Sequence, residues 1–178
     1  TWVDDEILSI EGKDFSLKWN LMTGNAVSLI YHDREIFAFP AGLPSQFFLQ
    51  AFRAPTDNDR GFGNWLADDW EKHGMAHPER TKKWIEWGRN PDASVWIRVV
   101  TGNRYAKGSI ENNACYTVFG DGSIDADFEF VPEGELPELP RLGIAIILDK
   151  WLEYFSWYGR GPHENYPDRK TSAFFGLW

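Results

Sequence analysis

The chain has 178 residues, of which 43% are hydrophobic, and its 27 acidic and 18 basic side chains give a formal net charge of −9. A chain of this size can bury about 70% of its unfolded surface without a metal or disulfide, and the single cysteine, Cys115, excludes an intramolecular disulfide framework. The acidic balance disfavours a nucleic-acid partner, and the apolar stretches, such as 142–148, are too short to span a membrane.

Apolar and polar residues alternate along much of the chain, which is typical of half-buried β-strands. Phe15, Leu17 and Trp19 alternate with polar neighbours, and the same pattern returns at 124–130. Turn sequences at 23–25, 32–34 and 120–122 predict hairpins. We therefore predict an all-β, antiparallel fold. Its candidate strands are 15–20, 26–31, 35–39, 46–53, 81–87, 94–101, 114–119, 123–131, 141–148 and 152–158.

A short helix is predicted over 65–72. Asn64 can cap its start, Asp68 and Asp69 lie in its first turns, and Gly74 can end it. The proline-rich segment 132–140 has no apolar period and is interpreted as a solvated connection. Without repeats or low-complexity tracts, residues 1–178 are taken as a single, partial domain.

Ten tryptophans are unusual in a chain of this length, and sugar-binding proteins use such rings as stacking platforms. Most of them are nevertheless expected to pack in the core because they lie in strand patterns. The expected core tryptophans are Trp19, Trp84, Trp96 and Trp157, and the expected exposed pair is Trp65 and Trp70.

The first concentrated motif is 53–64, RAPTDNDRGFGN. Its Asp and Asn residues favour turns and its glycines permit unusual backbone angles, so it is predicted to project as a functional loop. A calcium loop is disfavoured because Gly61 and Phe62 stand where an EF-hand needs a ligand and its sharp-turn glycine.

The second motif is 158–169, YGRGPHENYPDR. Its Gly159-Arg160-Gly161 run is too short for the GxGxxG sequence of a dinucleotide-binding loop. Two interpretations stay open: a turn in which Asp168 or Glu164 pairs with an arginine, or a polar cluster that lines a pocket. A metal site at His73 and His77 is disfavoured by Gly74 between them, and no carboxylate pair for glycoside hydrolysis can be nominated from sequence.

These two motifs, together with PRLG at 140–143, resemble the C-terminal domain of the large bacterial β-galactosidases of glycoside hydrolase family 2, over essentially the whole chain. The resemblance implies a galactose-mutarotase-like β-supersandwich, here truncated. It implies a substrate-adjacent loop formed by Asp57, Asn58, Asp59, Arg60 and Gly61, with Gly61 as the hinge. It also implies a polar cluster formed by Arg53, Arg141, His163, Glu164, Asn165, Tyr166, Asp168 and Arg169.

The resemblance further implies that the catalytic glutamates and the Mg²⁺ and Na⁺ ligands of the parent enzyme belong to a TIM barrel and other domains, so no catalytic residue, metal or cofactor is expected in this chain. Residues 60–64 depart from the loop of the best-known members, so the resemblance does not imply that this loop closes in the same manner. The chain starts without Met and stops in aromatic residues, so we expect a piece of a longer protein, with exposed strand edges that favour self-association. No compartment is predicted.

The expected function is therefore that of a non-catalytic part of a retaining β-galactosidase that acts on terminal β-D-galactosides. In this role the chain would contribute a wall of the substrate pocket and help subunits to pack. Two alternatives remain: a carbohydrate-binding module that uses Trp65 or Trp70, and a sugar mutarotase with His163 and Glu164 as acid and base.

Overall fold

The computed structural model describes residues 1–40, 46–61, 63, 65–166 and 168–178. By its internal contacts the chain divides into two compact units, Thr1–Leu148 and Asp149–Trp178. Among the described residues, no helix is both long and apolar enough to cross a membrane.

The first sheet of the larger unit is an antiparallel meander with the order β1-β2-β3-β4-β5. The alternation seen in the sequence sets its two faces: Phe15, Leu17 and Trp19 are buried, whereas Lys18 points to solvent. Gly24, at φ +76°, turns β3 into β4. The strands are β1 (Trp2–Asp4), β2 (Ile7–Glu11), β3 (Phe15–Asn20), β4 (Asn25–Tyr31) and β5 (Arg34–Glu35).

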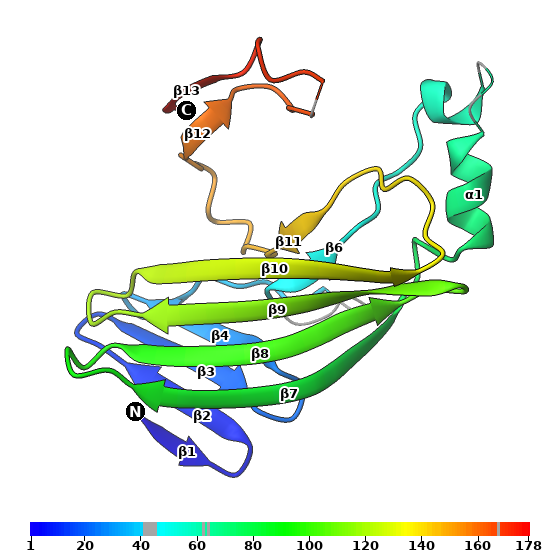
Figure 1. Cartoon of the computed structure of the whole chain (residues 1–178). Helices are drawn as coiled ribbons and strands as arrows, with labels where there is room; N and C mark the ends of the chain where they lie inside the picture. The colour runs from blue at the N-terminus through cyan, green and yellow to red at the C-terminus, as the bar shows by residue number, and fades with distance from the viewer. Residues whose placement is uncertain (41–45, 62, 64, 167) are drawn as a thin grey trace. The chain divides into compact units, whose positions relative to one another are not determined.

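The second sheet has the order β10-β9-β8-β7 and is built from three consecutive antiparallel pairings (Figure 1). Along β9, every second residue from Ile110 to Val118 is buried, so one face of this sheet is turned to the core. A bulge between Lys82 and Trp84 shifts the register of β7 against β8. The strands are β7 (Glu79–Arg89), β8 (Val95–Arg104), β9 (Gly108–Val118) and β10 (Ile124–Gly134).

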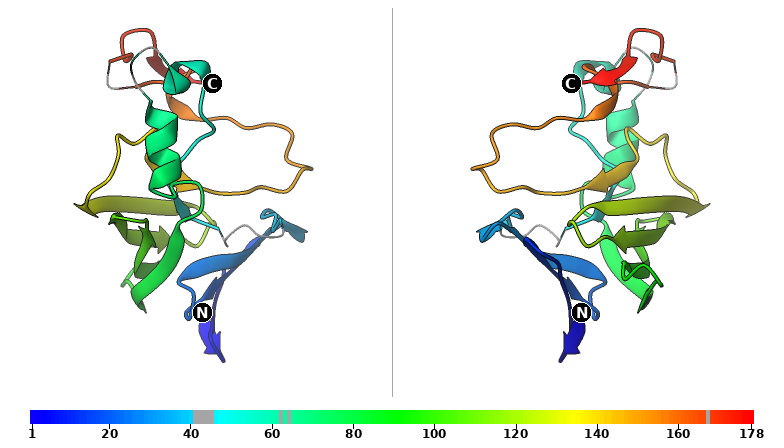
Figure 2. Two further views of the ribbon diagram at one scale, coloured as in Figure 1. Left: turned by 90° about the vertical axis from the view of Figure 1, so that its right-hand side faces the viewer. Right: turned by 90° about the vertical axis from the view of Figure 1, so that its left-hand side faces the viewer.

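The main core lies between these two sheets, which form separate layers in the edge-on views of Figure 2. Trp19 is fully buried at its centre; its ring lies 4.8 Å from that of Tyr116 and stacks on Phe47 at 5.7 Å. Large buried rings of this kind dominate core energetics because each removes a wide apolar surface from water.

A smaller core lies where β6 (Phe48–Gln50) pairs with β11 (Gly143–Ala145) and where α1 (Leu66–Lys72) packs. The helix follows Trp65 and ends at Lys72; His73 is its C-cap, and Gly74 at φ +68° reverses the chain. The expected cap Asn64 lies outside the described residues. The buried members of this core are Leu49, Ala51, Trp70, Met75, Tyr105 and Ile110.

The smaller unit contains one antiparallel pair, β12 (Tyr158–Gly161) with β13 (Phe174–Leu177). Among its described residues only Gly161 and Ala173 are buried. Its exposed apolar side chains include Tyr154, Phe155, Tyr158, Phe174, Phe175 and Leu177.

The prediction of an all-β, antiparallel sandwich is confirmed, with boundaries that shift by a few residues. The predicted strand 152–158 is wrong, since β12 begins only at Tyr158, and 35–39 contributes only Glu35 to β5. The strands β1, β2 and β13 were not predicted. The assignment of 1–178 to one domain stays a prediction.

The expected roles of the tryptophans are confirmed for Trp19 and for Trp65, which is 60% exposed. They are wrong for Trp84, which is 45% exposed, and for Trp70, which is buried. The bulge in β7 turns Trp84 outward, while the inner face of α1 carries Trp70 into the smaller core.

Candidate functional site

The first motif forms a loop that leads from β6 into a short 3₁₀ turn, η1 (Asp57–Arg60). Asp59 is buried there, and its carboxylate accepts hydrogen bonds from Arg53 Nη1 at 2.6 Å and Nη2 at 3.3 Å. The same carboxylate accepts from the Thr56 backbone N–H at 2.6 Å and hydroxyl at 2.8 Å. We call Arg53, Thr56 and Asp59 the loop clamp.

The electrostatics of the loop clamp keep Asp59 ionised. The hydrogen bond from Arg53 is the main cause, and the Thr56 donors add to it, so the pKa of the Asp59 carboxyl lies well below its ordinary value although burial opposes this. A carboxylate held by four donors is unsuited to donate a proton or to act as a free nucleophile. The hydrogen bonds of the clamp therefore fix the shape of the loop.

The loop clamp is attached to α1 through Trp70. The Arg53 guanidinium lies 5.4 Å from the centre of the Trp70 ring, and Phe52 meets the same ring edge to face at 6.3 Å. The Trp70 indole N–H donates to the Glu138 carbonyl at 2.8 Å. One side chain thus connects the loop, the helix and the segment that precedes β11.

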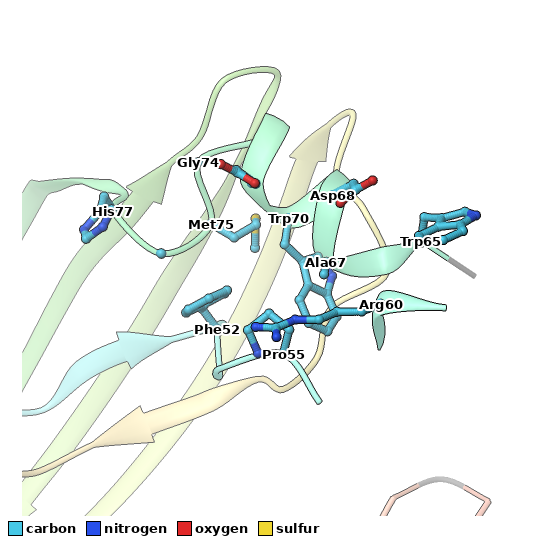
Figure 3. Close-up of a pocket in the computed structure, with 12 residues that line it drawn as sticks. Phe52, Pro55, Arg60, Trp65, Ala67, Asp68, Trp70, Gly74, Met75 and His77 are labelled. Atoms are coloured by element: carbon cyan, nitrogen blue, oxygen red, sulfur yellow. The ribbon is translucent and has the colours of Figure 1, made fainter. Parts of the chain in front are cut away.

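A cavity of about 520 Å³ opens beside this arrangement, between the loop and α1 (Figure 3). Its floor is apolar, with Phe52, Trp70 and Met75, and Trp65 lies at its α1 end, away from Phe52. This combination of an apolar floor and a few polar groups is usual for small-molecule sites. The polar side chains that line the cavity are Arg60, Asp68, Glu71 and His77.

The residues of the predicted substrate-adjacent loop differ in their exposure to solvent. Asp59 points inward, whereas Asp57, Asn58 and Arg60 are exposed. Gly61 has an extended backbone at φ −164°, a conformation that any residue adopts, and open space surrounds its Cα. Its role as a hinge stays a prediction.

The residues of the predicted polar cluster are distributed over both units, and the cluster itself stays a prediction. Arg53 belongs to the loop clamp, and Arg141 is an exposed residue just before β11. The remaining members lie in the smaller unit, where Tyr166 donates its hydroxyl proton to Glu164 at 3.3 Å. The members that are exposed in that unit are His163, Glu164, Asn165, Asp168 and Arg169; Pro167 of the same motif lies outside the described residues.

Arg160, which sequence reasoning did not select as a site residue, organises this second motif. Its Nη1 donates to the carbonyls of Lys170 and Ala173, each at 2.9 Å, and its guanidinium lies 4.8 Å from the Phe175 ring centre. The ion pairs found in the described part of the chain include neither Asp168 nor Glu164. The interpretation of a turn held by such a pair is therefore wrong; backbone carbonyls take the arginine instead.

Thr56 was also not selected as a site residue, although it lies within the quoted motif, and Trp70 was nominated only as an exposed ring of a carbohydrate-binding module. The Arg53–Asp59 spacing of six gave no signal because only the folded turn brings the two together. Among the described residues, no group of three or more His, Cys, Asp or Glu side chains is placed to hold a metal ion.

Comparison with known proteins identifies the class. The family model described as "Beta galactosidase small chain" matches residues 11–178. The chain belongs to this family.

Individual relatives agree with this. The chain is 29% identical over 175 residues to a β-galactosidase of Priestia megaterium and 32% identical over 175 residues to one of Lactobacillus delbrueckii subsp. bulgaricus. It is also 29% identical over 195 residues to one of Clostridium acetobutylicum. In each case 98% of this chain is covered, but only 16%, 16% and 18% of the relative. The chain thus spans about a sixth of the length of these curated relatives.

Proposed function

We propose that this chain serves as a non-catalytic domain of a retaining β-galactosidase that hydrolyses terminal β-D-galactosides, and that its first motif forms part of the wall of the substrate pocket. The observation that carries the proposal is the loop clamp. In the clamp the buried carboxylate of Asp59 accepts hydrogen bonds that hold the loop. The side chains of Asp57, Asn58 and Arg60 stay exposed and are available for contacts with a ligand or another domain.

The carboxylates that line the cavity support the same view. A retaining glycosidase needs two carboxyl groups about 5 Å apart on either side of the glycosidic bond, and its general acid is usually one whose pKa burial has raised. Asp68 and Glu71 are exposed on α1, and the buried Asp59 is shifted in the opposite direction. The catalytic glutamates, and the Mg²⁺ and Na⁺ sites, would then belong to other parts of the enzyme.

The first experiment assays the purified chain with a chromogenic β-galactoside. We expect no hydrolysis above that of buffer. Hydrolysis that disappears when Asp68 or Glu71 is changed to Ala would contradict the proposal.

The second experiment uses the whole β-galactosidase that contains this domain. Asn58→Ala and Asp57→Ala are expected to change KM or kcat for a galactoside several-fold, because both side chains would face the pocket. Asp125, exposed on β10, provides the control, and Asp125→Ala is expected to leave both constants unchanged. If the loop variants leave KM and kcat unchanged, as the control does, the proposed pocket-wall role is contradicted.

A second candidate function is carbohydrate binding by the chain itself, favoured by the 60% exposed Trp65 at the α1 end of the cavity. Calorimetric titration with galactose or lactose tests it. Millimolar or tighter binding that Trp65→Ala abolishes, and that Trp84→Ala preserves, would support a binding module. Trp84 is a matched control because it is 45% exposed on β7, outside this cavity.

The mutarotase alternative has little geometric support. His163 and Glu164 are both exposed in the smaller unit, where Glu164 accepts from Tyr166. Polarimetry on fresh α-galactose tests this, since accelerated mutarotation would favour it.

The proposal includes contacts with the remaining domains and between subunits, since the relatives are about six times longer than this chain. The smaller unit offers the surface: Tyr154 is 93% exposed and Tyr158 78%. Such apolar surface is normally covered in an assembly. The chain alone should therefore self-associate, and a strictly monomeric elution at high concentration would count against these contacts.

A further inference from the structure

A second cavity in the larger unit differs from the first by its charge. It measures about 360 Å³ and opens between the β3–β4 turn, β6 and the inner face of β7 and β8. Two of its lining residues are cations, Arg80 and Lys82, and none of its described lining residues is acidic. The other lining residues are Met22, Thr23, Asn25, Phe48, Leu49, Thr81, Thr101, Gly102 and Asn103.

The bulge in β7 explains why cations face inward here. Arg80 pairs with Asn103 and Lys82 with Thr101, on the face whose other residues enter the cores. The bulge shifts the alternation of the two faces by one residue, so that beyond it Ile85, and not Trp84, points to the inner face. The two charges therefore stand on the core side of the sheet, at the end where the sandwich opens into the cavity.

Both cations are held in place but keep free donors. The Arg80 guanidinium lies 5.5 Å from the Phe48 ring centre, and within the described part of the chain it forms neither an ion pair nor a hydrogen bond. Lys82 Nζ donates to the Leu21 carbonyl at 3.3 Å, which leaves two of its three protons. A Cβ on Gly24 would lie 3.0 Å from Lys82 Cγ, so this glycine makes room for the lysine stem.

The contrast with the next residue is informative. Lys83 points to the outer face, where its ammonium group pairs with Glu111 at 2.5 Å. The outer lysine, Lys83, thus has a carboxylate partner, whereas no described residue of the chain supplies a carboxylate to Arg80 or Lys82. Two like charges a few residues apart repel each other unless an anion lies between them.

We propose that this cavity binds a small molecule through a phosphate or carboxylate group. Arg80 offers a planar fork that matches two oxygens of such a group, and Lys82 adds a point charge. Hydroxyls of Thr23 and Thr101 line the same space and can hydrogen-bond the rest of the ligand. A volume of 360 Å³ is at the lower end of small-molecule pockets. This site is independent of the galactosidase proposal and distinct from the cavity beside α1.

The inward charges have another explanation, because β7 is an edge strand of its sheet. Charged side chains that point inward on an edge strand prevent it from pairing with another sheet. In that case Arg80 and Lys82 would maintain solubility and bind nothing. The test separates the two roles.

The experiment titrates the folded chain with inorganic phosphate and with citrate by calorimetry, at constant ionic strength against chloride. Saturable binding of at least one probe in the millimolar range is expected. Arg80→Gln and Lys82→Gln should each weaken it about tenfold, whereas Lys83→Gln, which removes the same charge one residue away, should stay within twofold. Arg80→Lys should give an intermediate loss because it keeps the charge and loses the fork.

Three outcomes overturn the proposal. The first is no saturable binding of either probe. The second is an equal loss in Lys82→Gln and Lys83→Gln, which would show only the general effect of charge. The third is unchanged affinity in Arg80→Gln and Lys82→Gln, together with elution of these variants as larger species than the natural chain. That result would assign the two residues to protection of the edge strand. Near-UV circular dichroism establishes that each variant is folded, and Arg80→Lys, the smallest change, gives a result if a glutamine variant unfolds.

Discussion

The two motifs that carry the family resemblance use their charged residues in opposite ways. In 53–61 the charges of Arg53 and Asp59 are turned inward and satisfy each other and Thr56. In 159–169 Glu164, Asp168 and Arg169 are exposed, and the half-buried Arg160 holds the loop by donating to backbone carbonyls. A distinctive sequence therefore does not say which residues are structural; burial and hydrogen bonding do.

The largest expected effect tests how firmly the first motif is anchored. Trp70→Ala should lower the free energy of unfolding by about 3–5 kcal/mol, because it removes a buried ring under Arg53 and leaves the Glu138 carbonyl without its donor. Urea denaturation measures this. The control is Tyr154→Ala, which removes a ring that is 93% exposed and should change the value by less than about 0.5 kcal/mol. Equal losses in the two variants would contradict the contrast.

A smaller effect is expected for the loop clamp. Asp59→Ala should cost about 2 kcal/mol, since it removes a buried acceptor of charge-assisted hydrogen bonds from Arg53 and leaves the Thr56 N–H without the Asp59 carboxylate. Asp57→Ala removes the same charge from an exposed position of the same turn and should cost less than about 0.5 kcal/mol. Urea denaturation of both variants makes the comparison, and a reversed order would show that the clamp is not structural.

The loop clamp also predicts a pH dependence. The pKa of Asp59 is lower in the folded protein than its ordinary value of 3.8, so its contribution to stability is complete above about pH 4 and is lost as the pH falls further. The difference in unfolding free energy between the natural chain and Asp59→Asn should therefore shrink from pH 5 to pH 2. The pKa values of Asp92 and Asp121 are also lowered, by hydrogen bonds from Ser94 and Ser123, but they act equally in both proteins and cancel. A gap that is constant with pH would contradict this.

The smallest effects are expected in the second motif. His163→Ala and Glu164→Gln should each change the stability by less than about 0.5 kcal/mol, because both side chains are exposed. Arg160→Met should speed hydrogen exchange of the β13 amides, since Ala173, just before that strand, loses its donor. Exchange that is faster in the His163 or Glu164 variant than in the Arg160 variant would contradict this assignment.

The sandwich could be predicted from sequence where one face of a strand is buried and the other exposed, as in β3 and β9. The strand β2 was missed because it is short and begins with two adjacent apolar residues, Ile7 and Leu8, so that its alternation extends over few residues. The segment 152–158 has strand-like residues, but only Tyr158 at its end is in a strand; in the described structure residues 152–156 belong to no strand, and a strand forms only with a partner.

The sites were less predictable for the same physical reason. Residues of the first loop could be nominated from local turn chemistry, but the direction of each side chain depends on a fold that brings Arg53, Asp59 and Trp70 together. In the sequence, Arg80 and Lys82 are indistinguishable from the solvent-facing polar residues of an alternating strand. Only the bulge, which shows in the pairing of β7 with β8, places them on the inner face.

The pairing of β6 with β11 has a consequence for folding kinetics. It joins Gln50 to Gly143, about ninety positions apart along the chain, whereas β7 to β10 pair with their immediate successors. Closing a long loop costs more entropy than closing a hairpin. We therefore expect the four-stranded meander to form early and the β6–β11 ladder to close late, so that Ile144→Ala accelerates unfolding in stopped-flow measurements and leaves the refolding rate nearly unchanged.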